Sequence, residues 1–298
     1  MSKKYTFYPG CSSKSSSAHL EKSLRAVAPK VGIELEEIDD WNCCGTSVGH
    51  ITAGHLPNAA LSGRNLALAQ EMSGNDVLTA CAACYIHTHE ANEHIREDEK
   101  FKANVNEALG AAGKSYDGSL HVRHVCEVLV NDVGMDAVKE QVTNPLAGLK
   151  VAGWVGCQTL RPFAHTERGG AYDTYDQPEF LDSFIEACGA EAVPFKNKTS
   201  CCGGSIAVIS PDKSLGLMKT ILDEAKEQGA DCVTTPCPLC QQNLEMYQPL
   251  INQTFGTDFN IPVVFYSQLM AVAFGMKSDE AALNQHLIPP TKLAGMAK

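Results

Sequence analysis

The sequence predicts an α/β fold with two pseudo-symmetric halves, each a small, mostly parallel sheet with flanking helices. Short runs rich in β-branched and aromatic residues alternate with segments whose apolar residues recur every three to four positions. The same order of elements occurs twice along the 298 residues. Each copy also carries cysteines in the same order, just after predicted strands. Such alternation is typical of parallel sheets covered by helices.

The first half is expected to alternate strands with helices and to close with a strand that enters a helix. Its segments, in order, are residues 4–10, 20–31, 33–38, 61–72, 76–79 and 121–135. The first strand ends at a Pro-Gly turn. Residues 92–117 are charged and helical in pattern, and we expect them to form a tail that leads toward the second half.

The second half repeats this order. Its expected segments are residues 150–156, 179–188, 190–195, 214–228, 231–235 and 261–276. We place the boundary near Asn144 and Pro145, which predicts a first domain over residues 1–144 and a second over residues 145–298.

Ten of the thirteen cysteines form two sets of five, each with a lone cysteine, a Cys-Cys-Gly string and a CxxC motif. The first set is Cys11, Cys43, Cys44, Cys81 and Cys84, and the second is Cys157, Cys201, Cys202, Cys237 and Cys240. All these motifs are expected just past the carboxyl ends of strands, where open α/β sheets place their sites. Each CxxC is expected to begin a helix, whose free N–H groups stabilise thiolate. Each set should therefore hold one metal centre.

Composition and charge exclude several classes. With 24 Lys+Arg against 35 Asp+Glu, the formal net charge of −11 repels a phosphate backbone, so we exclude nucleic acid as a partner. No run approaches the roughly 18 to 20 apolar residues that span a bilayer, and the opening lysines precede no apolar segment. We expect a cytoplasmic protein with no membrane span and no secretory leader. In that compartment cysteines more often bind metals or act in catalysis than form disulfides.

The number of cysteines favours an iron–sulfur cluster over zinc. Structural zinc takes four tetrahedral ligands, commonly from two CxxC pairs, whereas each half offers five cysteines and a single CxxC. Adjacent cysteines suit neighbouring irons of a multinuclear cluster better than one tetrahedral ion, because successive side chains diverge. The ferredoxin run C-x₂-C-x₂-C-x₃-C is absent, so a conventional cubane is not indicated. A zinc site remains an alternative at this point.

The cysteine order resembles the duplicated cysteine-rich CCG domain found in the B subunit of heterodisulfide reductase. Nearby strings agree, including YPGC at residues 8–11 and GADCVTTPCPLC at residues 229–240, and the resemblance covers nearly the whole chain. It implies two non-cubane [4Fe-4S] clusters, one held by each set of five cysteines and sited at the strand carboxyl ends. One departure is that 43 residues separate Cys157 from Cys201, against 31 between Cys11 and Cys43. An insertion around residues 161–177 therefore reshapes the second site's surroundings.

The resemblance also implies a reaction and partners. In that family the coenzyme M–coenzyme B heterodisulfide is reduced to two thiols, with electrons delivered by a ferredoxin-like iron–sulfur subunit and a flavin-containing subunit. This chain has no GxGxxG motif, and its nearest P-loop likeness, residues 109–115, lacks the required first glycine. Separate electron donors are therefore expected.

Other candidate residues are weaker. His50, His55, His87 and His89 follow the cysteine motifs and could donate a proton to a departing thiolate, although solvated or packed histidines are the more common case. Arg161 could hold an anionic group of the substrate or form a surface ion pair. Cys126, Cys188 and Cys232 have apolar neighbours and are expected to be core thiols.

Three functions stay open from the sequence. The first is the catalytic disulfide-reducing subunit in a methanogen or a related anaerobe. The second is the same two-cluster subunit in a bacterial heterodisulfide-reductase-like complex of sulfur metabolism. The third is a zinc-stabilised or electron-relay module without a substrate. The type of metal centre distinguishes the zinc module from the first two.

Overall fold

The computed structural model describes residues 2–46, 54–160, 173–207 and 209–298. This part of the chain contains two four-stranded sheets in which every strand pair is parallel. The first sheet has the order β2-β1-β3-β4 and consists of β1 (Lys3–Tyr8), β2 (Ile33–Glu37), β3 (Val77–Thr79) and β4 (Val122–His124). The second has the order β6-β5-β7-β8 and consists of β5 (Lys150–Gly153), β6 (Glu191–Ala192), β7 (Cys232–Thr235) and β8 (Val263–Phe265).

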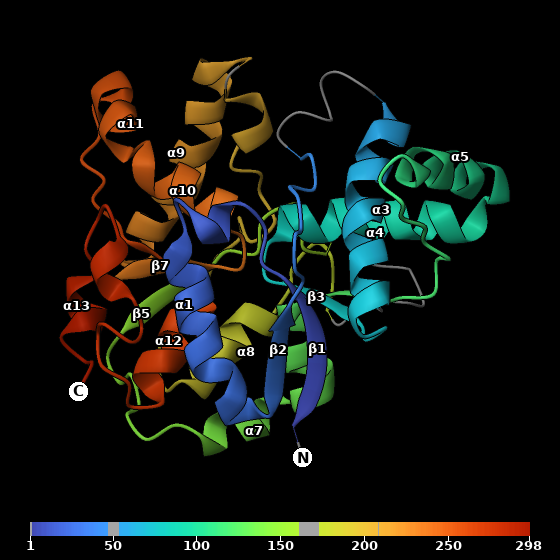
Figure 1. The fold of residues 1–298 in the computed structure, drawn as a ribbon. Coiled ribbons are helices and arrows are strands. Elements are labelled where there is room, and N and C mark those ends of the chain that lie inside the picture. Colours follow the sequence, from blue (N-terminus) through green and yellow to red (C-terminus); the bar gives the residue numbers. More distant parts are fainter. Residues whose placement is uncertain (1, 47–53, 161–172, 208) are drawn as a thin grey trace.

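Helices connect the strands and lie around both sheets (Figure 1). In the first half they are α1 (Ala18–Val27), α3 (His55–Met72), α4 (Ala82–Glu97), α5 (Glu99–Gly110), α6 (Val125–Val128) and α7 (Met135–Glu140). In the second half they are α8 (Phe180–Ala187), α9 (Pro211–Glu227), α10 (Pro238–Met246), α11 (Gln248–Phe255), α12 (Tyr266–Ala273) and α13 (Thr291–Ala294). Among the described residues, none of these helices has the length and apolar character that crossing a membrane requires.

The predicted fold class is confirmed: two α/β halves repeat one topology around parallel sheets. Strands β3, β7 and β8 are buried along their whole length, so side chains on both faces of these strands lie in the interior. Both CxxC motifs begin helices, α4 and α10, as predicted. The two sheets fall on either side of the expected boundary at residues 144 and 145, and the division into two domains stays a prediction.

Two segments differ from the expectations. The strand expected over residues 190–195 pairs only at Glu191 and Ala192. It is an edge strand whose donors to β5 are the backbone N–H groups of Glu191 and Val193, so the N–H that Pro194 lacks would face away from β5, as is usual for proline in a strand. Residues 92–117 are not a tail, because α4 extends to Glu97 and α5 follows it and packs on α3.

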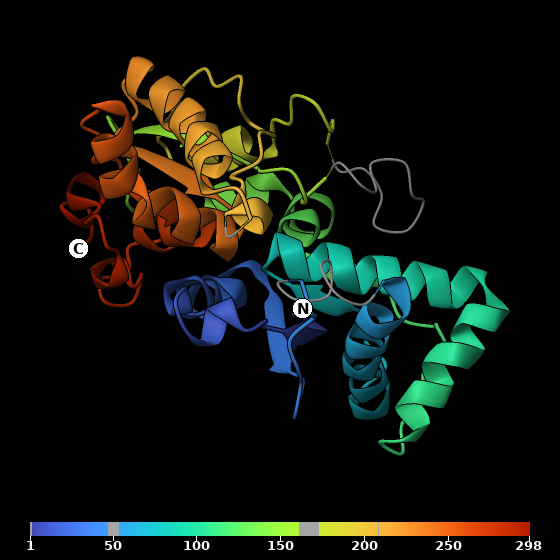
Figure 2. The ribbon, with the colours of Figure 1, turned by 90° about the horizontal axis from the view of Figure 1, so that it is seen from above.

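One hydrophobic cluster spans the two halves, beside clusters that lie mainly within each half. A single cluster of buried side chains contains Phe7 and Leu24 from the first half and Phe184, Tyr266 and Leu269 from the second. Seen from above, the two halves lie side by side along this junction, with α3, α4 and α5 projecting from one of them (Figure 2). Shared burial on this scale couples the position of one sheet to that of the other.

Candidate functional site

The first cysteine set lies at the carboxyl edge of the first sheet. Cys11 follows β1, Cys43 and Cys44 follow β2, and Cys81 and Cys84 follow β3. The Sγ atoms of Cys11 and Cys43 are 3.8 Å apart, and those of Cys44 and Cys84 are 3.7 Å apart. Cys81 caps the N-terminus of α4, and its Sγ accepts the backbone N–H of Cys84 over 3.5 Å. The parallel strands thus bring together thiols that are far apart in the sequence.

The second set has the same arrangement. Cys157 follows β5, and Cys237 is the N-cap residue of α10. The Sγ atoms of Cys202 and Cys240 are 3.7 Å apart, which repeats the pairing of Cys44 with Cys84. All five cysteines of this set line one narrow cavity of about 30 Å³.

A glycine in each half makes room for a thiol. Gly10 and Gly156 precede the lone cysteines and have φ of +77° and +76°, in the left-handed region that favours glycine. A Cβ atom at Gly10 would lie 2.7 Å from Cys84 Sγ, and one at Gly156 would lie 3.2 Å from Cys240 Sγ. Both sites therefore need a residue without a side chain just before the first cysteine.

The thiols of the first set are too close to ionise independently. A hydrogen bond with Cys43, together with burial, raises the pKa of Cys11 above its usual range. Hydrogen bonds with Cys44 and Cys81 likewise raise the pKa of Cys84, whereas hydrogen bonds from Cys43 and Cys84 lower that of Cys44. A thiol with a raised pKa keeps its proton and donates it in a hydrogen bond to a neighbouring thiolate. A bound cation would remove this conflict, because it stabilises several thiolates at once.

The two sets meet at the junction of the halves. The neighbouring thiol of Cys237 raises the pKa of Cys81, and the neighbouring thiols of Cys240 and Cys81 lower the pKa of Cys237. Ala82, which follows Cys81, also lines the cavity of the second set. Next to the CxxC of the second half, Ser16 Oγ donates to Gln242 Oε1 over 2.9 Å. The two cysteine sets are thus neighbours rather than separate sites.

The predicted proton donors occupy different environments. His55 is exposed at the start of α3, whereas His87 and His89 are buried on α4. His89 Nδ1 lies 3.3 Å from the carbonyl oxygen of Val122, so this ring faces β4. Burial lowers the pKa of His89. His50, Arg161 and residues 161–172 of the insertion lie outside the described residues.

The three remaining cysteines are core thiols, as predicted. Cys126, Cys188 and Cys232 are buried. Burial raises the pKa of each thiol, to about 12 for Cys188 and Cys232. Neutral thiols packed among apolar side chains are poor metal ligands.

Two residues beside the cysteines were not found from the sequence. His124, at the end of β4, is fully buried, and its Nδ1 accepts the backbone N–H of Cys126 over 3.1 Å. It interacts with the backbone at Ala80 and Pro236, the residues just before the two CxxC motifs. Asn243 directs its side-chain N–H at Cys202 Sγ, 3.6 Å away. His124 could have been found, because β4 pairs with β3 and ends at the same edge of the sheet.

Comparisons with known sequences agree with this duplication. The chain matches the family described as the cysteine-rich domain (CCG) twice, over residues 5–88 and 151–245. It is 34% identical, over 98% of its length, to the 8-methylmenaquinol:fumarate reductase membrane anchor subunit of Wolinella succinogenes, which it covers completely. It is 32% identical to the B subunit of the ferredoxin:CoB-CoM heterodisulfide reductase of Methanosarcina mazei, covering 96% of this chain and 94% of that protein.

One solved structure shares the fold. The crystal structure of a hypothetical protein from Helicobacter pylori matches 96% of this chain with a TM-score of 0.73 at 16% sequence identity. This chain spans 52% of that longer one. The likeness supports the two-halved architecture, and at this identity it supports the fold alone.

Proposed function

The chain belongs to the duplicated cysteine-rich domain family that includes the B subunit of heterodisulfide reductase, and from this membership we propose that it is the catalytic iron–sulfur subunit of a heterodisulfide-reductase-type complex. The proposed reaction reduces a disulfide of the coenzyme M–coenzyme B type to two thiols and consumes two electrons and two protons. The observation that supports the proposal is the approach of Cys81 to Cys237, with Ala82 lining the cavity of the second set; two sets this close could act on one substrate.

We propose that each set holds one non-cubane [4Fe-4S] cluster. The first would use Cys11, Cys43, Cys44, Cys81 and Cys84, and the second would use Cys157, Cys201, Cys202, Cys237 and Cys240. The donor set suits this group, because five thiols meet in each half, glycines leave room beside them, and a cation would let the crowded thiols ionise.

When bound, such clusters supply single electrons and iron ions with affinity for sulfur. The protein's own contribution is positioning. Its two CxxC helices start at the junction of the halves, so each sulfur of a disulfide would face a different cysteine set. Val155 and Leu239 give the second cavity part of its apolar lining. A ferredoxin-like subunit and a flavin-containing subunit would deliver the electrons.

A second candidate follows from the relative in Wolinella succinogenes. That protein is a subunit of a quinol-dependent fumarate reductase and aligns over its whole length. In this alternative the same cysteine sets pass electrons between a quinol and a partner, and no disulfide is reduced. A bacterial sulfur-metabolism complex would keep the two clusters but act on a different sulfur compound.

Electron paramagnetic resonance distinguishes these functions. The protein would be reduced anaerobically, freed of excess reductant, and measured before and after adding the coenzyme M–coenzyme B heterodisulfide, with the two free thiols as a control. We expect a new paramagnetic signal with the disulfide only. If a menaquinol analogue reduced the clusters and the disulfide left their signal unchanged, the quinol-linked function would be supported and the disulfide-reducing function would be wrong.

A further inference from the structure

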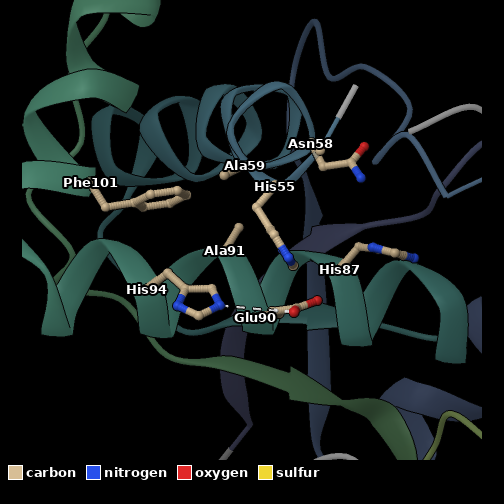
Figure 3. A pocket seen from close by; sticks show the side chains of 9 residues that line it. His55, Asn58, Ala59, His87, Glu90, Ala91, His94 and Phe101 are labelled. Atoms are coloured by element: carbon tan, nitrogen blue, oxygen red, sulfur yellow. Dashed lines mark ion pairs between the residues drawn. The ribbon is translucent and has the colours of Figure 1, made fainter. Parts of the chain in front are cut away.

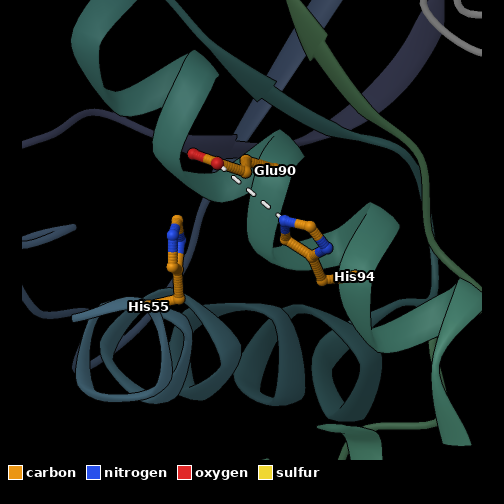
Figure 4. A group of neighbouring side chains, drawn as sticks. All are labelled: His55, Glu90 and His94. Carbon is orange, nitrogen blue, oxygen red and sulfur yellow. Dashed lines mark ion pairs between the residues drawn. The ribbon is translucent and has the colours of Figure 1, made fainter.

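Three potential metal ligands meet on the first half, away from the cysteines. His55 is the first residue of α3, and Glu90 and His94 lie one turn apart on α4. One ligand atom from each residue can be chosen so that all three lie within 4.8 Å of one another. Glu90 Oε1 and His94 Nε2 are 3.9 Å apart, and the rings of His55 and His94 are 6.1 Å apart. Figure 4 shows the three side chains directed at a common point between the two helices.

This point opens into a cavity of about 200 Å³. The cavity lies between α3 and α4, with Phe101 of α5 at one end (Figure 3). Asn58 and His87 also line it and place further polar groups beside the three ligands. A small ligand or water could therefore reach an ion held by them.

An ordinary surface ion pair does not account for the arrangement. Glu90 and His94 have the i, i+4 spacing at which exposed helical side chains often pair. His55, however, comes from another helix and faces the same point. Internal symmetry does not explain the cluster either. Counted from the CxxC motifs, the second half has Met246 and Leu250 where the first has Glu90 and His94.

We propose that His55, Glu90 and His94 bind one divalent transition-metal ion of the zinc type, separately from both cysteine sets. Two imidazoles and a carboxylate are ligands that Zn²⁺ accepts, and three protein ligands leave one tetrahedral position open. Bonds of about 2.0–2.1 Å place tetrahedral ligand atoms roughly 3.3 Å apart. The ligand atoms, now within 4.8 Å of one another, must therefore close by up to about 1.5 Å. His55 and His94 are exposed and can rotate to do so.

The ion would tie together the two helices beside the first cysteine set. The segment that precedes α3 carries Cys43 and Cys44, and α4 begins at the CxxC that contains Cys81 and Cys84. A bridge between these helices would hold the two segments in register. The open coordination position faces the cavity and would take water or a small anion.

X-ray absorption at the zinc edge tests this on the anaerobic protein with its cysteine sites loaded. After treatment with a chelator, one equivalent of Zn²⁺ would be added. We expect nitrogen and oxygen neighbours at about 2.0–2.1 Å and no sulfur at about 2.3 Å. Titration calorimetry should give one site, with affinity reduced at least tenfold in His94→Ala and His55→Ala. His121→Ala removes an exposed histidine from the same half and should bind like the unmodified protein.

Zinc with sulfur neighbours, or equal affinity in His94→Ala and the unmodified protein, would overturn the proposal. Iron content shows whether the proposed function fails independently of the zinc site. Because neither histidine is a proposed cluster ligand, His94→Ala should keep its full iron content whether or not zinc binds.

Discussion

Cys81 and Cys237, each the first cysteine of its CxxC motif, approach each other across the junction of the two halves, where their interaction raises the pKa of Cys81 and lowers that of Cys237. This approach makes the two repeated cysteine sets neighbours, and Ala82 lines the cavity of the second set. The halves are held in this position by their shared core and by polar contacts such as that between Ser23 Oγ and Ser267 Oγ, 2.7 Å apart. A disulfide with one sulfur facing each set would therefore need no large motion of the protein.

Removing one thiol from either set should cost iron. Cys44→Ser and Cys202→Ser each break an Sγ pair at 3.7 Å, so each variant should fall from about eight irons per chain toward four. Cys188→Ala is the matched control, because Cys188 is a buried core thiol outside both sets. Iron and acid-labile sulfide analysis of the anaerobic proteins gives the result. If Cys188→Ala lost as much iron as the other two, the assignment of ligands would be wrong.

Gly10→Ala should disrupt the first site alone. The new Cβ would lie 2.7 Å from Cys84 Sγ, so about half of the iron should be lost. Gly74→Ala is the control, because Gly74 also has a left-handed φ, of +65°, but nothing lies within 4 Å of its Cβ position. That variant should cost about 1 kcal/mol of backbone strain and keep its iron. Equal iron loss in both variants would point to strain rather than to the collision with Cys84.

Stability should fall as the solution is acidified, partly because of His19. Burial and the nearby charge of His286 lower the pKa of His19 to about 3, whereas an unfolded histidine titrates near 6.5. Between these values the unfolded chain binds a proton that the native protein does not, so the contribution of His19 to stability is full above pH 6.5 and declines below it. His19 should contribute about 2 kcal/mol of the loss between pH 7 and pH 5.

Urea unfolding at several pH values measures this contribution. His19→Gln should show a flatter pH dependence over the same range. Replacement of the exposed His121 is the control and should leave the pH profile unchanged. An unchanged profile in His19→Gln would show that other groups cause the acid loss.

The shared core should make the halves unfold together. Phe184 is buried and stacks on Tyr266, with ring centroids 5.8 Å apart, so Phe184→Ala should lower the free energy of unfolding by roughly 3–5 kcal/mol. Phe255→Ala, at an exposed position, should cost much less. Hydrogen exchange in urea can follow β1 and β7 separately. Loss of protection in β7 at a concentration where β1 stays protected would argue for independent halves.

Local patterns were sufficient to predict much of the fold and the grouping of the cysteines. The strand before Cys81 and the helix after it are encoded in adjacent residues, and the same holds around Cys237. The contact between these two cysteines could not be predicted, because it depends on how the halves pack. The spacing of Glu90 and His94 is visible in the sequence. The approach of His55 to these two residues is not visible in the sequence, because it depends on the packing of α3 on α4 and α5. In that packing Val105 lies close to Gly63, which has no side chain in the way.

The most direct test of the two-cluster site combines metal analysis with X-ray absorption at the iron and zinc edges on anaerobically purified protein. The prediction is about eight irons and eight sulfides per chain, with sulfur neighbours around iron and none around zinc. Stoichiometric zinc with sulfur neighbours, persisting after reconstitution with iron and sulfide, would contradict the account, because the cysteine sets would then hold structural zinc.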